Sequence, residues 1–142
     1  MHYDFDFIII GSGFGGSVSA HRLTEKGYRV GVIEMGKRYR AQDFPKSNWN
    51  LRKFLWAPEF GLHGIFRMTL FRHAWVLSGV GVGGGSLVYA NTLLVPPDTV
   101  WQDQQWAHLK AWKVVLPPFY ATARQMLGAT TNPYLGNADK LL

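Results

Sequence analysis

Gly11-Ser12-Gly13-Phe14-Gly15-Gly16 follows an apolar run and decides the fold of this chain. The run ends in Ile8 to Ile10, which is typical of a buried parallel strand. The glycines have separate uses: Gly11 permits a sharp turn, Gly13 lets the backbone approach a pyrophosphate, and Gly16 lets a helix pack closely. The N-terminus of that helix then presents N–H groups and partial positive charge to the phosphates. The stretch therefore predicts a dinucleotide-binding turn.

The segment after this turn completes a predicted βαβ unit over residues 5–34. Residues 14–26 suit an amphipathic helix that ends at Gly27, and a second buried strand is predicted over residues 29–34. Glu34 lies at the end of that strand, close to the separation of about 20 residues at which an acid binds the ribose 2′-hydroxyl. A carboxylate there repels a 2′-phosphate, which favours FAD or NAD over NADP. The alternative is a surface glutamate at the end of a strand.

The predicted fold class is α/β, a Rossmann-like FAD/NAD(P)-binding domain with an incomplete parallel sheet. The chain has 142 residues, 47% of them hydrophobic, which is the size of one domain. The complete fold needs about six strands, and only two are apparent before residue 35. We therefore expect the chain to be the N-terminal part of a longer protein, with its substrate domain absent.

A second glycine-rich stretch, GVGVGGGSLVYAN, runs over residues 79–91. So many glycines indicate that side chains would collide with something, and a flat ring or a pyrophosphate against the backbone is the first candidate. Ser86 is predicted to cap a short helix over residues 87–91, whose amides would also face the ligand. A glycine-rich hairpin or linker is the alternative, although linkers favour serine over valine and leucine.

The two motifs together resemble the glucose–methanol–choline (GMC) flavoprotein oxidoreductases, most closely their cholesterol-oxidase-like branch. The resemblance includes GSGFGG, the acid in Val-Ile-Glu-Met-Gly and GVGVGGGSLVYANTL, and it extends through residues 49–58, 104–109 and 125–128. It covers almost the whole chain in the order of the family's N-terminal quarter. The second motif, at this distance from the first, is the more specific of the two.

The resemblance implies FAD as the cofactor, with the first motif at the pyrophosphate, Glu34 at the adenosine ribose and the second motif along the flavin. The cofactor-binding residues that it implies are Gly11, Gly13, Phe14, Gly15, Gly16, Glu34, Gly83, Gly84, Gly85, Ser86, Tyr89 and Asn91. Family members often carry an Asn-Gly pair shortly after the glycine run, where this chain has Tyr89-Ala90-Asn91. Which of Tyr89 and Asn91 contacts the flavin stays open.

The activity that the resemblance implies is oxidation of the CH–OH group of an alcohol, a sterol being one substrate, by hydride transfer to flavin N5. In the family the base is a histidine from the C-terminal half. The histidines of this chain are His2, His21, His63, His73 and His108. None falls at that position, so we predict no catalytic residue here and no turnover by this chain alone. A non-catalytic truncated remnant and a fragment of an NAD-dependent dehydrogenase are the alternatives.

Residues 36–73 form a basic and aromatic excursion in a chain of net charge +6. We expect these residues to pack beneath or over FAD, with peripheral membrane contact or substrate access as the alternative. Nucleic-acid binding is not expected, because no signature of it accompanies the basic residues. The last predicted part is helical and covers residues 98–128, with a helix from about residue 118 that Gly128 ends.

Several classes of site are not predicted. The chain has no cysteine, and no histidine spacing suggests a metal site.

Asp4 and Asp6 stand where a secretory signal would be basic. Residues 74–97 are uncharged and long enough to span a bilayer, but their glycines suit a cofactor loop better. The sequence thus predicts a cytoplasmic protein, and it does not indicate the oligomeric state.

Overall fold

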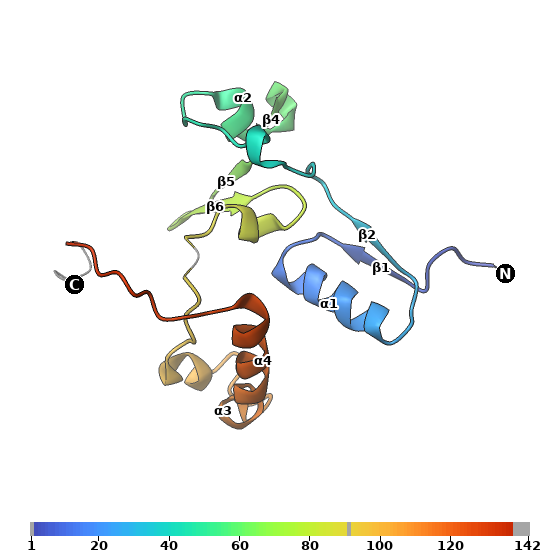
Figure 1. Ribbon diagram of the computed structural model, residues 1–142, viewed down its shortest axis with the longest axis vertical. Helices are drawn as coiled ribbons and strands as arrows, with labels where there is room; N and C mark the ends of the chain where they lie inside the picture. Colours follow the sequence, from blue (N-terminus) through green and yellow to red (C-terminus); the bar gives the residue numbers. More distant parts are fainter. Residues whose placement is uncertain (1, 91, 138–142) are drawn as a thin grey trace. The chain divides into compact units, whose positions relative to one another are not determined.

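The computed structural model describes residues 2–90 and 92–137, which divide between two compact units (Figure 1). Unit 1 is Met1–Asn91 and contains both glycine-rich stretches. Unit 2 is Thr92–Leu142 and is mainly helical. The two units are described separately below.

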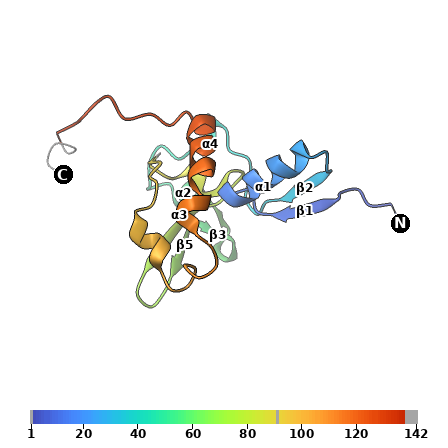
Figure 2. The ribbon, with the colours of Figure 1, turned by 90° about the horizontal axis from the view of Figure 1, so that it is seen from below.

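Unit 1 begins with a parallel strand pair joined by a helix (Figures 1 and 2). The elements are β1 (Phe7–Ile10), α1 (Phe14–Glu25) and β2 (Val30–Ile33), and α1 packs on both strands. The register places Phe7 opposite Val30 and Ile10 opposite Ile33. The turn into α1 needs Gly11, whose φ of +87° is strained for other residues. This strand–helix–strand unit is the predicted start of a Rossmann-like fold.

The helix α1 lies so close to the preceding turn that Gly16 has no room for a side chain. A Cβ atom there would collide with the carbonyl oxygen of Gly11 and would come within 3.3 Å of the Ile9 side chain. The predicted use of Gly16, close packing of the helix, is therefore seen directly.

Most apolar residues of this sheet are exposed, which corrects the expectation of two buried strands. Ile10 is 88% exposed, and Ile8, Val32 and Ile33 are each exposed by about half. The sheet has only two strands and is covered on one face by α1. A parallel sheet buries its residues only when helices cover both faces and further strands cover its edges. Burial of these residues thus depends on structure beyond this strand pair.

The basic and aromatic segment folds into short elements that precede an antiparallel hairpin. These elements are η1 (Ala41–Asp43), α2 (Leu51–Phe54), β3 (Trp56–Ala57), η2 (Pro58–Phe60) and β4 (Leu62–His63). The hairpin, β5 (Phe66–Leu70) with β6 (Trp75–Gly79), was not predicted. Apolar residues recur at every second position in β5, as period-two strands require, but basic and aromatic neighbours obscure this pattern.

The base of the hairpin holds the small core of unit 1. Among the described residues, the buried hydrophobic side chains are Ile65, which is 1% exposed, and Val80, which is 3% exposed. The Val80 amide donates to the Ile65 carbonyl oxygen at 2.8 Å. The second glycine-rich stretch begins at this core and contains the 3₁₀ helix η3 (Gly84–Leu87).

Unit 2 contains η4 (Asp98–Gln102), α3 (Trp112–Val115) and α4 (Pro117–Leu127). The Lys113 ammonium contacts the Asp98 carboxylate at 2.8 Å, and the Trp112 indole N–H donates to the Trp106 carbonyl at 2.8 Å. The helix α4 ends at Gly128, the residue predicted to end it, with a left-handed φ of +62°.

Replacement of Gly16 by Ala should destabilise unit 1 by about 1–3 kcal/mol, because the added methyl overpacks the contact with Gly11. The measurement is urea unfolding followed by far-UV circular dichroism. Gly15→Ala is the matched control: no atom lies within 4 Å of its added Cβ. That control should be neutral or stabilising by about 0.5–1 kcal/mol, as for alanine replacing glycine within a helix. Equal midpoints for the two variants would contradict the packing described.

Candidate functional site

The two glycine-rich stretches lie side by side in unit 1. A Cβ atom at Gly84 would come within 2.9 Å of the Cα atom of Gly13, so these backbones are in contact. Phe14 and Tyr89 pack edge to face, with ring centroids 5.6 Å apart. The structure therefore brings together the residues predicted at the pyrophosphate and those predicted along the flavin.

Ser12 joins both stretches to the acid at the end of β2. It is 7% exposed, and its hydroxyl donates to Glu34 Oε2 at 2.7 Å and accepts from the Gly83 amide at 3.0 Å. Sequence reasoning named the glycines on either side and missed Ser12. The available signal was a hydroxyl inside a turn that must lie against the strand end carrying Glu34.

Glu34 is held by donors from two directions. Its Oε2 also accepts from the Ser12 amide at 2.9 Å, and its Oε1 accepts from the Gly36 amide at 2.9 Å. Burial raises the pKa of Glu34, but the hydrogen bonds from Gly36 and Ser12 outweigh it and leave the pKa below its usual value. The group at this position is thus a carboxylate anion beside the glycine turn.

The space next to Gly13 fits a pyrophosphate. No protein atom lies within 4 Å of a Cβ built at Gly13, whereas the neighbouring Gly16 and Gly84 are crowded by backbone. The helix α1 begins at Gly13 without a side-chain cap, and the amides of its first turn have no intrahelical partner. An anion beside Gly13 would meet these amides and the positive end of the helix dipole.

Protein atoms, rather than a ligand, account for the glycines of the second stretch. A Cβ at Gly79 would collide with the Gly84 carbonyl, and one at Gly81 would come within 2.9 Å of the Lys37 carbonyl oxygen. The amide of Val82 donates to the Lys37 carbonyl at 3.1 Å. The many glycines, which were expected to make room for a flat ring, therefore have a second explanation. Three chain segments meet here and leave no space for side chains.

The predicted capping role of Ser86 is wrong. The helical turn is η3, which begins after Gly83 at a left-handed φ of +110°, three residues earlier than expected. The Ser86 hydroxyl donates to the Gly83 carbonyl at 2.9 Å. Ser86 thus closes the turn behind Gly83. Asn91, the other candidate beside Tyr89, lies outside the described residues.

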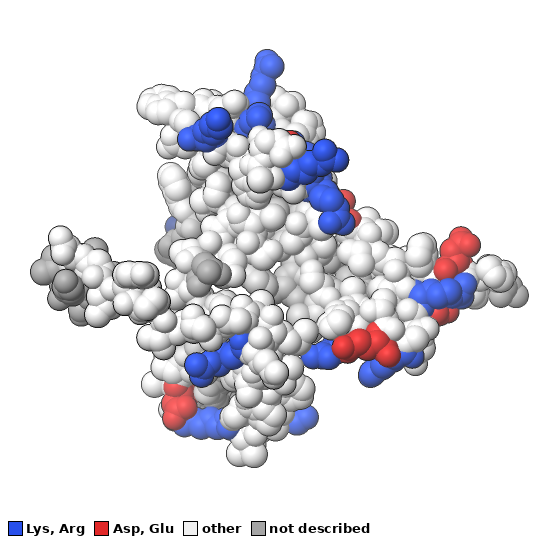
Figure 3. All heavy atoms as spheres, viewed as in Figure 1, with Lys and Arg blue, Asp and Glu red and all other residues white. Residues whose placement is uncertain are grey.

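The basic and aromatic segment lines a cavity beside η3. The cavity has a volume of about 330 Å³, and its apolar walls include Phe44, Phe54, Ile65, Phe66, Leu87 and Val88. Figure 3 shows Lys and Arg side chains on the surface around α2, which contributes Arg52 and Lys53. The packing of this segment against a bound flavin stays a prediction.

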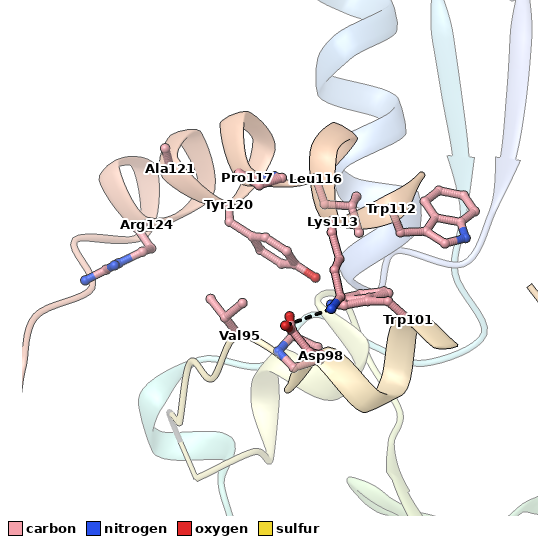
Figure 4. Close-up of a pocket in the computed structure, with 11 residues that line it drawn as sticks. Val95, Asp98, Trp101, Trp112, Lys113, Leu116, Pro117, Tyr120, Ala121 and Arg124 are labelled. Atoms are coloured by element: carbon pink, nitrogen blue, oxygen red, sulfur yellow. Dashed lines mark hydrogen bonds and ion pairs between the residues drawn. The ribbon is translucent and has the colours of Figure 1, made fainter. Parts of the chain in front are cut away.

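A further cavity, of about 320 Å³, lies within unit 2 (Figure 4). Its walls include Trp101, Trp112 and Tyr120, and the Asp98–Lys113 ion pair lies at its side. These residues are not among the predicted site residues. The network around Ser12 consists of residues of unit 1 alone.

The described residues contain neither a metal-binding group nor a membrane-spanning helix. No group of three His, Asp or Glu residues within residues 2–90 and 92–137 is arranged to hold a metal ion. His21 pairs with Glu25 at 3.2 Å, and His63 packs on Trp56. Over the same residues, the helices are too short and too polar to cross a bilayer.

Comparison with known proteins relates the chain to dinucleotide-binding and alcohol-oxidising families. Residues 9–54 match the NAD(P)-binding Rossmann-like domain family. The chain is 55% identical over 99% of its length to a cholesterol oxidase of Acinetobacter baumannii. It is 32% identical over 75% of its length to a long-chain-alcohol oxidase of Arabidopsis thaliana, and 31% identical over 70% to a GMC-type oxidoreductase of Mycobacterium tuberculosis.

The chain spans only 25% of the cholesterol oxidase, and 14% and 16% of the other two relatives. The matches confirm the Rossmann-like fold class, the resemblance to GMC oxidoreductases and the prediction of FAD as the cofactor. They do not test individual site residues, so the roles of the twelve predicted residues stay predictions.

Substitution of Glu34 by Gln should flatten the pH dependence of stability in acid. A carboxyl whose folded pKa is depressed stabilises the native state above the unfolded value of 4.5, and this stability is lost as pH falls through the folded pKa. The stability difference between the native chain and Glu34→Gln should therefore shrink between about pH 6 and pH 3. Urea unfolding at several pH values measures it. The control is Glu59→Gln, which removes an exposed carboxylate of η2. A stability difference between the native chain and Glu34→Gln that stays constant with pH would contradict the hydrogen-bond network around Glu34.

Proposed function

We propose that this chain, which belongs to the GMC flavoprotein oxidoreductases, is the FAD-binding portion of an enzyme that oxidises the CH–OH group of an alcohol. The observation that carries the proposal is the meeting of both glycine-rich stretches and Glu34 around Ser12. The open position at Gly13 lies within this arrangement. A dinucleotide needs an anion site next to a ribose acceptor, and here the two adjoin.

The chain's own residues would bind and orient the cofactor. The first-turn amides of α1 would hold the pyrophosphate beside Gly13, and the Glu34 carboxylate would accept hydrogen bonds from the adenosine ribose. Residues 83–86 and Tyr89 would lie along the flavin. In support, Gly84 adjoins Gly13, and Tyr89 packs on Phe14. Bound FAD supplies the capacity to accept a hydride from the alcohol.

The substrate class that we propose is a sterol or another apolar alcohol. The support is the 55% identity to a cholesterol oxidase, together with the weaker match to a long-chain-alcohol oxidase. The base that takes the alcohol proton would come from another part of the enzyme, because no histidine of this chain adjoins the Ser12 network. A peripheral contact of the basic and aromatic residues with a membrane would give such an enzyme access to its substrate.

Gly13→Val should abolish FAD binding without unfolding the chain. The valine side chain would occupy the open space beside Gly13, and the extended backbone there (φ −65°) accepts an L-residue. Fluorescence titration with FAD measures the affinity, and circular dichroism checks the fold. Ser19→Val, which adds the same side chain at an exposed position of α1, should bind like the native chain. Unchanged FAD affinity in Gly13→Val would refute the proposed pyrophosphate site.

Turnover should require more than this chain. The chain loaded with FAD should not reduce its flavin when cholesterol or a long-chain alcohol is added, because it supplies no base for the alcohol proton. The full-length enzyme from the same source should reduce its flavin with at least one of these alcohols. Flavin absorbance under anaerobic conditions measures both. Failure of the full-length enzyme with every alcohol would contradict the proposed activity, whereas reduction by the chain alone would contradict the absence of a base.

A further inference from the structure

Protein donors already occupy most of the Glu34 carboxylate. An ionised carboxylate offers about four acceptor sites. Oε2 accepts from the Ser12 amide and the Ser12 hydroxyl, and Oε1 accepts from the Gly36 amide. A ribose presents two adjacent hydroxyls, so binding of both to this carboxylate requires one of the three protein donors to leave.

The donors differ in how easily they leave. The amides of Ser12 and Gly36 are fixed by the backbone of the turn and of the strand end. The Ser12 hydroxyl alone can turn its hydrogen away by rotation about one bond. Its oxygen also accepts from the Gly83 amide at 3.0 Å, and this bond does not require that the hydroxyl donate to Glu34.

We propose that Ser12 is a positioning residue whose hydroxyl releases Glu34 when a ribose hydroxyl binds there, while its oxygen keeps holding Gly83. Ser12 thus gives Glu34 a replaceable partner and fixes the second glycine-rich stretch in both states. The inference rests on the proposed function, since it takes Glu34 as the ribose acceptor.

Loss of the hydroxyl should have opposite effects at the two ends of the cofactor. Ser12→Ala frees an acceptor site on Glu34, so ADP, which carries only the adenosine end, should bind at least as tightly as before. The same change leaves the Gly83 amide without its acceptor, so a ligand that also uses the second stretch should bind less tightly. The ratio of the FAD to the ADP dissociation constant should rise about fivefold or more, the effect of one lost hydrogen bond.

Calorimetric titration of the native chain, Ser12→Ala and Ser12→Thr with ADP and with FAD tests the proposal. Ser12→Thr keeps the hydroxyl and should keep the native ratio. An equal loss for both ligands in Ser12→Ala would show a merely structural role and overturn the proposal, as would an unchanged ratio. A native chain that binds neither ligand would instead refute the proposed function, and the inference would fall with it.

Amide exchange followed by NMR provides a test that does not depend on Ser12→Ala folding. In the native chain the Gly83 amide should stay protected when ADP is added, because the Ser12 oxygen continues to accept from it. Loss of that protection on ADP binding would overturn the proposal. In a folded Ser12→Ala variant the Gly83 amide should exchange faster than in Ser12→Thr, and equal rates would also overturn it.

Discussion

The buried hydroxyl of Ser12 is the contact on which the arrangement of unit 1 depends. It joins the first glycine turn, the end of β2 and the second glycine-rich stretch, which is 71 residues away in sequence. Each of these segments is short, and most of their residues are half-buried. A buried hydrogen bond that lost one partner would leave a polar group unsatisfied, so the three segments are held in one mutual arrangement. The candidate site is the surface that this arrangement leaves open.

Glycine serves two different purposes at this junction. Gly16, Gly36, Gly79 and Gly84 are required because protein backbone approaches closer than a Cβ atom allows. Gly13 has open space instead, and its surroundings suit an anion. A glycine motif therefore marks a ligand site only where the added Cβ would meet nothing of the protein. By this criterion Gly11, Gly13 and Gly15 mark the pyrophosphate position more sharply than residues 83–86 mark the flavin position.

The first third of the fold was predictable from sequence because its signals are local. The turn at Gly11, the helix ending before Gly27 and the strand ending just before Glu34 each follow from neighbouring residues. Burial was not predictable in the same way, since Ile10 needs partners that lie outside the strand pair. The hairpin β5–β6 was missed because basic and aromatic neighbours obscure its alternating pattern. The role of Ser12 was missed because it depends on a contact between segments far apart in sequence, which periodicity does not reveal.

A crystal structure of this chain with ADP would show whether unit 1 binds the adenosine end of a dinucleotide. The ribose hydroxyls should lie on the Glu34 carboxylate, and the diphosphate should lie on the first-turn amides of α1 beside Gly13. ADP bound in the cavity of unit 2, or a diphosphate held away from Gly13, would contradict this placement.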